Sequence, residues 1–318
     1  MQTAYLDHPG MRVALENGTI VLRAPDGLRL GTLPSKNLER LILQGDILCS
    51  TGAIRHLLEQ GSSILCLSPR RSHAVAHLQG GLHANAQIRL QQYRGYHDTV
   101  FRVRLAKRIV FAKLQAQQRH IEEWLRRERI RRRALVQAQE ACTQSLDSLA
   151  SAASIDAVMG IEGRTAHAYF QALFTQVPPA VSSEVRSRRP PRDPINVLLS
   201  LGYTLAHHEA VTAAYALGLD PYIGFLHEIA VGRESLGCDL TEFLRQLVDT
   251  FVVHLLQEGI LRKEHFTQEN DASCLLGKAG RAHFYRAWAR LAPALRRLAR
   301  RYARWIVANL RAQELSPA

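Results

Sequence analysis

Residues Leu78-Gln79-Gly80-Gly81-Leu82 divide this 318-residue sequence into two parts with different patterns. Before the glycine pair, short apolar runs alternate with turn signals. After it, Ala, Leu, Arg and Gln dominate, while Gly and Pro become rarer. The first pattern is typical of strands and the second of helices. We therefore predict an α+β protein, with an N-terminal β-rich domain over residues 1–80 and a larger all-α domain over residues 82–318.

The N-terminal part contains signals for strands and for one helix. Asn17-Gly18 lies between two apolar stretches, which predicts a two-residue hairpin turn. Ser50 can cap a helix that runs through Leu58, and Gly61 can end it. No cluster of titratable residues is evident in this part. We expect this domain to serve in dimerisation and the helical domain to carry the catalytic site.

The overall charge of the sequence is strongly basic. It carries 41 Lys and Arg residues against 28 Asp and Glu residues, a formal net charge of +13. This balance favours a polyanionic partner.

The five cysteines form no Cys-x-x-Cys pair, which indicates reduced thiols and a cytoplasmic protein. No signal peptide is evident and no apolar run approaches the roughly 20 residues of a membrane helix, so we expect no membrane partner.

Within this basic background, four side chains are candidates for a metal site. Glu162 lies between glycines, His227 ends an apolar run, and Asp239 and Glu242 are spaced i and i+3, on one face of a helix. Converging carboxylates repel one another unless a cation lies between them. Oxygen ligands with one imidazole suit Mg²⁺ or Mn²⁺ better than Zn²⁺. Acidic metal ligands in a basic protein indicate phosphodiester chemistry on nucleic acid.

Four stretches of the helical part, taken in order, resemble the signatures of a known family. Met159-Gly-Ile-Glu-Gly-Arg-Thr-Ala-His-Ala-Tyr-Phe170 resembles the glutamate motif of the universal CRISPR-associated endonuclease and integrase of spacer acquisition. Arg189-Pro-Pro-Arg-Asp-Pro-Ile-Asn-Val-Leu-Leu-Ser-Leu-Gly-Tyr203 is similar to its second signature. Leu217-Gly-Leu-Asp-Pro-Tyr-Ile-Gly-Phe-Leu-His227 resembles its histidine motif, and Gly232-Arg-Glu-Ser-Leu-Gly-Cys-Asp-Leu-Thr-Glu-Phe-Leu-Arg245 its final acidic motif.

The resemblance implies an activity, a metal and partners. Glu162, His227 and Glu242 would bind Mg²⁺ or Mn²⁺, and a 3′-hydroxyl of incoming double-stranded DNA would attack a phosphodiester of a CRISPR repeat. The protein would act in antiviral defence as a homodimer, joined to a small ferredoxin-like CRISPR-associated partner. ATPase, metalloprotease and serine hydrolase activities have no motif in the sequence.

Several alternatives remain open at the level of sequence. Asp239 either binds the ion directly or supports a residue that does. Glu162 and Glu242 could instead be structural, in buried salt bridges to Arg164 or Arg245. The same site chemistry would also suit a metal-dependent nuclease of branched or repair DNA, and without catalysis the protein would be a DNA-binding scaffold.

Ten arginines are candidates for contacts with DNA phosphates, because the guanidinium fork matches phosphate oxygens. One group lies within the proline-rich segment Val181 to Asp193, which we expect to display its arginines. Another lies beside an apolar stripe of a C-terminal helix that Pro293 can open, whose aromatic residues we expect in the core. The candidates are Arg164, Arg186, Arg188, Arg189, Arg192, Arg245, Arg290, Arg297, Arg301 and Arg304.

Overall fold

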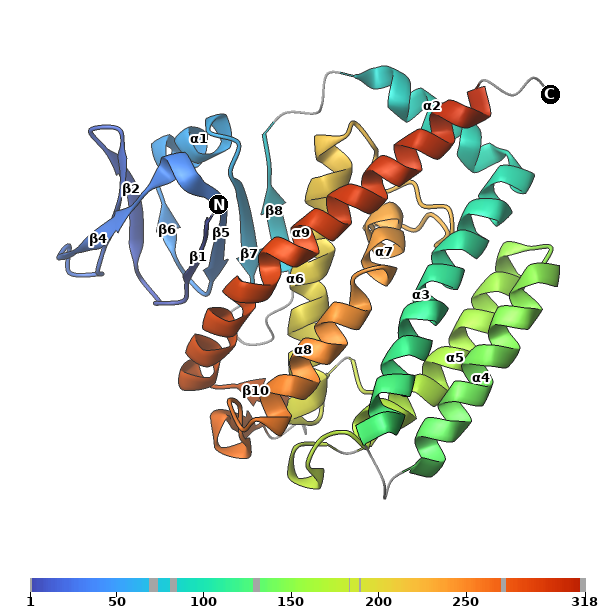
Figure 1. Ribbon diagram of the computed structural model, residues 1–318. Coiled ribbons are helices and arrows are strands. Elements are labelled where there is room, and N and C mark those ends of the chain that lie inside the picture. The colour runs from blue at the N-terminus through green and yellow to red at the C-terminus, as the bar shows by residue number, and fades with distance from the viewer. Residues whose placement is uncertain are drawn as a thin grey trace. The chain divides into compact units, whose positions relative to one another are not determined.

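The computed structural model describes residues 2–68, 74–80, 85–127, 132–182, 184–188, 190–269 and 273–314. The chain divides into two compact units. The first comprises residues 1–82 with residues 285–290, and the second comprises residues 83–284 with residues 291–318. Strands dominate the first unit and helices the second, so the α+β class is confirmed (Figure 1).

The first unit contains eight described strands and one α-helix. They are β1 Gln2–Leu6, β2 Arg12–Glu16, β3 Thr19–Arg23, β4 Arg29–Leu33, β5 Leu38–Gln44, β6 Leu48–Cys49, α1 Thr51–Glu59, β7 Ser63–Leu67 and β8 Ala74–Leu78. The predicted hairpin is confirmed, because β2 and β3 pair antiparallel around Asn17-Gly18, where both residues have positive φ. The predicted helix is confirmed as well, and the Ser50 hydroxyl accepts the Ala53 N–H at 3.1 Å.

These strands form two four-stranded sheets. In one, with the order β1-β5-β7-β8, the first three strands are parallel and β8 is antiparallel to β7. In the other, with the order β4-β3-β2-β6, the hairpin strands are antiparallel and β6 is parallel to β2. Parallel pairs need crossover connections, and α1 lies in the connection between the parallel strands β5 and β7.

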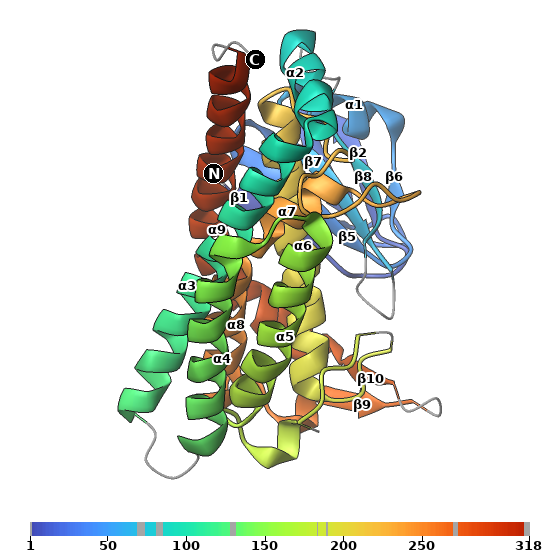
Figure 2. The same ribbon diagram turned by 90° about the vertical axis from the view of Figure 1, so that its right-hand side faces the viewer.

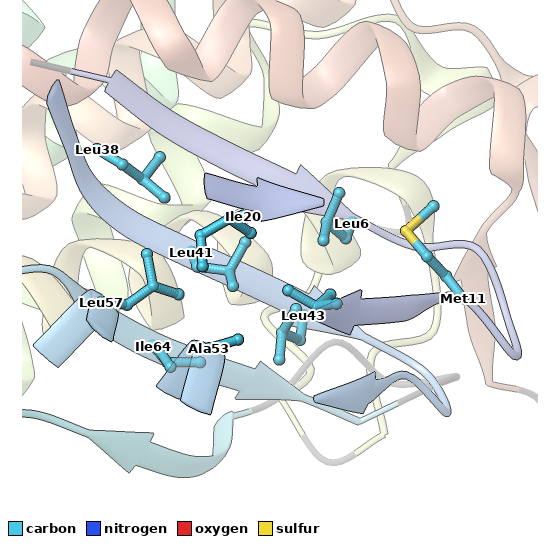
Figure 3. Packing of buried hydrophobic residues seen from close by; sticks show 10 residues of the cluster. Leu6, Met11, Ile20, Leu38, Leu41, Leu43, Ala53, Leu57 and Ile64 are labelled. Carbon is cyan, nitrogen blue, oxygen red and sulfur yellow. The ribbon is translucent and has the colours of Figure 1, made fainter. Parts of the chain in front are cut away.

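Aliphatic side chains from both sheets and from α1 fill the core of this unit (Figure 3). Ile20 comes from one sheet, Leu41 and Ile64 from the other, and Leu57 from the helix; each is at most 1% exposed. Burying one such side chain contributes roughly 1.5–3 kcal/mol, so the core is enough to hold two sheets of short strands. The described cluster is held by apolar packing.

The second unit is built mainly from helices. They are α2 Ala86–His97, α3 Thr99–Arg127, α4 Arg132–Ser151, α5 Ile155–Phe174, α6 Pro194–Ala216, α7 Ser235–Glu242, α8 Arg245–Gln257 and much of α9 Lys278–Glu314. The unit also contains a two-stranded sheet, β9 Phe266–Gln268 with β10 Cys274–Leu276, which the prediction of an all-α domain did not include. In the described part of the chain, no helix is both long and apolar enough to cross a bilayer.

The helices of the second unit pack in two groups. Helices α3, α4 and α5 contact one another, and α6 contacts α7 and α8 (Figures 1 and 2). The short α7 also contacts α3, and seven of its eight residues are buried. This helix therefore lies where the two groups meet, with its side chains within reach of both.

The C-terminal helix differs from the prediction at its start. Pro293 does not open it, because α9 already begins at Lys278 and the proline lies inside the helix. A proline there removes one backbone hydrogen bond. The preceding turns are held by buried side chains, including Phe284 and Trp288, which offset that loss. The aromatic residues of its apolar stripe pack against the protein but are half-buried, and Tyr302 stacks on Phe243 with 3.6 Å between ring centroids.

Candidate active site

Glu162 lies on α5, whose N-terminus is well defined. Ser154 caps the helix by accepting the Ala157 N–H at 3.2 Å, and Asp156 adds a favourable negative charge in the first turn. Gly160 and Gly163 flank the glutamate, and a Cβ built at either position meets no atom within 4 Å. The surface of α5 is therefore open at these two glycines.

His227 lies on the segment between α6 and α7, which side chains of α2 and α3 hold in place. Gln92 donates to the Asp220 carbonyl at 2.9 Å and to the Ile223 carbonyl at 2.7 Å. Arg102 donates to the Phe225 carbonyl at 3.1 Å. These bonds satisfy backbone groups that have no helical partner, so the segment carries His227 in a defined position.

Asp239 organises the backbone around His227 and orients its ring. Its carboxylate accepts the N–H groups of Phe225 at 2.5 Å, Leu226 at 3.0 Å and His227 at 2.9 Å. It also bonds the imidazole Nδ1 at 2.8 Å. Because a carboxylate can only accept here, Nδ1 carries the proton and Nε2 is left as the nitrogen that can bind a metal. Asp239 itself is fully buried.

The carboxylates of Glu162 and Glu242 converge on one cation, the ammonium group of Lys113. This lysine projects from α3 and pairs with Glu162 of α5 and, at 2.5 Å, with Glu242 of α7. The exposed fractions of the three side chains are 7%, 18% and 4% respectively. Arg245 adds a second positive charge, with Nε 2.9 Å from each carboxylate oxygen of Glu242.

These charges set the protonation of the site. Burial opposes ionisation of Glu242, but Arg245 and Lys113 outweigh it and hold the pKa of this carboxyl well below its usual range. Burial also works against a charged His227. The hydrogen bond and charge of Asp239, together with the charge of Glu242, nevertheless raise the pKa of the imidazole. The histidine is thus within electrostatic reach of Glu242.

Arg245 is itself held by the second sequence signature. Its guanidinium lies over the Tyr203 ring at 4.5 Å from the centroid. The Tyr203 hydroxyl in turn donates to Asp249 on α8, which also accepts from Tyr169 at 3.1 Å. The conformation of the arginine beside Glu242 therefore depends on aromatic and acidic side chains from three helices.

Two of the three predicted metal ligands thus share a cation, and the third lies near them. Among the residues that the structure describes, no three His, Cys, Asp or Glu side chains already form a metal-binding group. The donor chemistry nevertheless fits a divalent ion. Lys113 demonstrates that both carboxylates reach a single positive charge, and Nε2 of His227 supplies an imidazole nitrogen.

The family model described as CRISPR associated protein Cas1 matches residues 4–290. The chain belongs to this family. A curated relative from Thermodesulfovibrio yellowstonii, named CRISPR-associated endonuclease Cas1 1, is 31% identical over 287 residues. The alignment covers 90% of this chain and 89% of the relative. The resemblance and the enzyme class inferred from the sequence are therefore confirmed.

Solved structures of the Cas1 fold agree with this assignment. A Cas1 protein from Thermotoga maritima has a TM-score of 0.85 at 23% identity, covering 98% of this chain and 97% of that one. A casposase bound to an integration product has a TM-score of 0.84 at 20% identity, covering 97% and 91%. These structures share the fold across both units.

One of the two buried salt bridges considered in the sequence analysis, that of Glu242, is found in this Cas1 family member. Glu242 does pair with Arg245, as that alternative required. Glu162 pairs with Lys113 instead of Arg164, whose side chain is exposed. Lys113 was not among the residues predicted from the sequence, although a signal was available: the lysine lies on the buried face of α3, seven residues after Ala106 and four after Ile109. A buried charge needs a partner of opposite sign.

The candidate DNA-contacting arginines differ in exposure. The expectation that the proline-rich segment displays all of its arginines is wrong for Arg186. Its guanidinium donates to Asn196 at 2.7 Å and lies over the rings of Phe170 and Tyr203. Burial lowers its pKa to about 10. Arg188 and Arg192 are exposed, whereas Arg189 lies outside the described residues.

The arginines of α9 retain a surface position. Their side chains are exposed, while apolar residues of the same helix such as Leu295 and Ile306 are buried. The predicted arginine stripe is therefore exposed, and the predicted apolar stripe beside it is buried at Leu295 and half-buried at its other positions. The exposed arginines are Arg290, Arg297, Arg301 and Arg304.

Proposed function

We propose that this Cas1 family member is a metal-dependent DNA endonuclease and integrase of CRISPR adaptation. It would insert short foreign DNA into a CRISPR array. One observation carries the proposal: carboxylates from α5 and α7, far apart in sequence, converge on one positive charge beside an oriented histidine. In a basic protein of this family, that arrangement supports phosphodiester chemistry.

Glu162, His227 and Glu242 would hold the ion, which we take to be Mg²⁺ or Mn²⁺. When bound, such an ion stabilises the alkoxide of a 3′-hydroxyl and the charge that builds up on the phosphate. Asp239 keeps the proton of His227 on Nδ1, so that Nε2 would be the nitrogen available to hold the ion. We place Asp239 in this supporting role, because both of its oxygens already accept hydrogen bonds.

Arginines around the site would bind the DNA backbone. The exposed residues of α9 and of the proline-rich segment, together with Arg164, can contact phosphates without reading the bases. Arg245 combines two roles, since it holds Glu242 and keeps 23% of its side chain exposed. The incoming fragment and the CRISPR repeat, both double-stranded, would be the DNA partners.

The two parts of the chain would have different roles, one in dimerisation and one in catalysis. We assign residues 1–80 to dimerisation, because that part contains two sheets around an aliphatic core. We assign residues 82–318 to catalysis, because they carry the acidic site. The assembly would be a homodimer joined to a small ferredoxin-like CRISPR-associated protein in the cytoplasm.

The test combines site variants with two DNA assays. Glu162→Gln, His227→Ala and Glu242→Gln should each abolish cleavage and strand transfer in the presence of Mn²⁺. Glu140→Gln, which neutralises an exposed carboxylate on α4, is the matched control and should keep full activity. Wild-type turnover in excess EDTA would refute the metal site.

A second readout separates integration from repair cleavage. A labelled DNA fragment with free 3′-hydroxyls is incubated with a plasmid that carries a CRISPR repeat. An integrase joins the label to the plasmid, whereas a repair nuclease only shortens or nicks its substrates. Cleavage without joining, in the presence of the small partner protein, would overturn the integrase assignment and leave the nuclease.

A further inference from the structure

Lys113 is a buried cation inside the group of residues assigned to the metal. Only 7% of its side chain is exposed, and its ammonium lies between the carboxylates of Glu162 and Glu242. Burying an ammonium group is costly unless opposite charges surround it, and here two carboxylates do so. Removing either acid would leave the lysine with less compensation. The three side chains therefore form one electrostatic unit.

We propose that Lys113 is an internal counter-cation that competes with the divalent ion for the carboxylates of Glu162 and Glu242. The inference rests on the proposed function, because it concerns the same site. Lys113 contacts one oxygen of Glu162 and one of Glu242, and a divalent ion bound to the same pair of carboxylates would repel the ammonium at such short range. Metal binding therefore drives the ammonium away from at least one of its two partners.

The lysine side chain is suited to this exchange. Its four-carbon stem is flexible, so that the ammonium can move while the backbone of α3 stays in place. Arg245 is a different case, because its guanidinium lies over Tyr203 and pairs with Glu242 through a fixed geometry. Of these two cations, Lys113 is the one that touches both carboxylates and so the one that the metal displaces.

The exchange has two consequences. Without metal, the ammonium offsets the mutual repulsion of the carboxylates and keeps α3, α5 and α7 together. With metal, part of the binding free energy is spent on displacing the ammonium, so the measured affinity is weaker than the carboxylates alone would provide. The lysine thereby stabilises the metal-free site and keeps metal binding reversible.

The central experiment measures Mn²⁺ affinity of the DNA-free protein by electron paramagnetic resonance. Lys113→Met keeps the stem and removes the charge, and it should bind Mn²⁺ about tenfold more tightly than wild type, a size common for coupling between two ligands. Lys107→Met is the matched control on the same helix. Its ammonium bonds the Ala150 carbonyl at 2.8 Å, and its affinity should equal that of wild type.

A second measurement uses the wild-type protein, in case Lys113→Met does not fold. An acylating reagent labels lysine amines, and mass spectrometry follows each site. Saturating Mn²⁺ should increase the labelling of Lys113 several-fold, because the ammonium loses its ion pairs, while the labelling of Lys107 stays constant. Equal labelling of Lys113 with and without Mn²⁺ overturns the proposal.

The outcomes separate this inference from the proposed function. If Glu162→Gln and Glu242→Gln lose Mn²⁺ binding but Lys113→Met binds it like wild type, only the role of Lys113 is refuted. If wild type and both glutamine variants bind Mn²⁺ equally, or none of them binds it, the metal site and the role of Lys113 fail together. Tighter binding by Lys113→Met and weaker binding by the glutamine variants support both.

Discussion

Asp239→Asn is the most informative single substitution, because it changes one buried atom of a carboxylate whose two oxygens both accept hydrogen bonds. The carboxylate accepts three backbone N–H groups through its two oxygens and also bonds Nδ1 of His227. Asparagine has the same shape but one oxygen and one NH2 group. In one orientation the NH2 faces the N–H groups of Phe225 and Leu226. In the other it faces His227.

The size of the effect follows from this count. In either orientation two of the hydrogen bonds that the carboxylate accepted are lost. In the first orientation the buried N–H groups of Phe225 and Leu226 point at the NH2 group, which is also a donor. An unsatisfied buried donor costs about 1–3 kcal/mol, so we expect unfolding free energy to fall by about 2–5 kcal/mol. If the NH2 instead donates to Nδ1, the imidazole proton moves to Nε2. That tautomer cannot bind a metal through Nε2, and the affinity for Mn²⁺ should fall about 10–100-fold.

Urea denaturation and Mn²⁺ binding measure the two effects separately. Asp220→Asn is the control, because the half-buried Asp220 accepts the Tyr222 N–H at 2.9 Å on the same segment, and its other oxygen accepts only the Tyr93 hydroxyl in an exposed hydrogen bond. It should lose less than about 1 kcal/mol. If Asp239→Asn kept wild-type stability and wild-type Mn²⁺ affinity, Asp239 would not position His227.

Three further predictions concern other parts of the structure. Gly224→Ala should destabilise the protein by about 1–3 kcal/mol in urea and weaken Mn²⁺ binding, since its Cβ would lie 2.7 Å from the Ser235 carbonyl carbon; wild-type values for both would contradict this. Neutralising three arginines of α9 should flatten the slope of log K against log salt by about 0.9 for each lost phosphate contact, whereas an unchanged slope would remove α9 from the DNA interface. The substitutions are Arg297→Gln, Arg301→Gln and Arg304→Gln. Burial, and to a lesser degree the charge of Arg127, lower the pKa of His120 to about 4, so the folded state binds a proton less readily than the unfolded state. Stability should therefore fall by about 3 kcal/mol between pH 6.5 and pH 4, and His120→Gln should show a correspondingly weaker pH dependence in thermal melts.

The amino-acid sequence alone determined the fold class and the main local structures. Asn17-Gly18 demands positive φ and so specifies a hairpin, and Ser50 caps α1 through its own hydroxyl. Such signals act over a few residues, which is why they can be recognised without tertiary contacts. The start of α9 could not be recognised in this way, because buried residues on both sides of Pro293 override the local preference against proline.

The candidate ligands were also visible in the sequence, but their partners were not. Glu162, His227 and Glu242 stood out as polar residues in apolar or glycine-rich surroundings. Only the packing of α3 against α5 and α7 revealed that Lys113 bridges the two glutamates, and only the path of the segment before α7 made Asp239 the support of His227. Ion pairs and hydrogen bonds act over a few ångströms, so residues distant in the chain acquire them only when the fold brings them together.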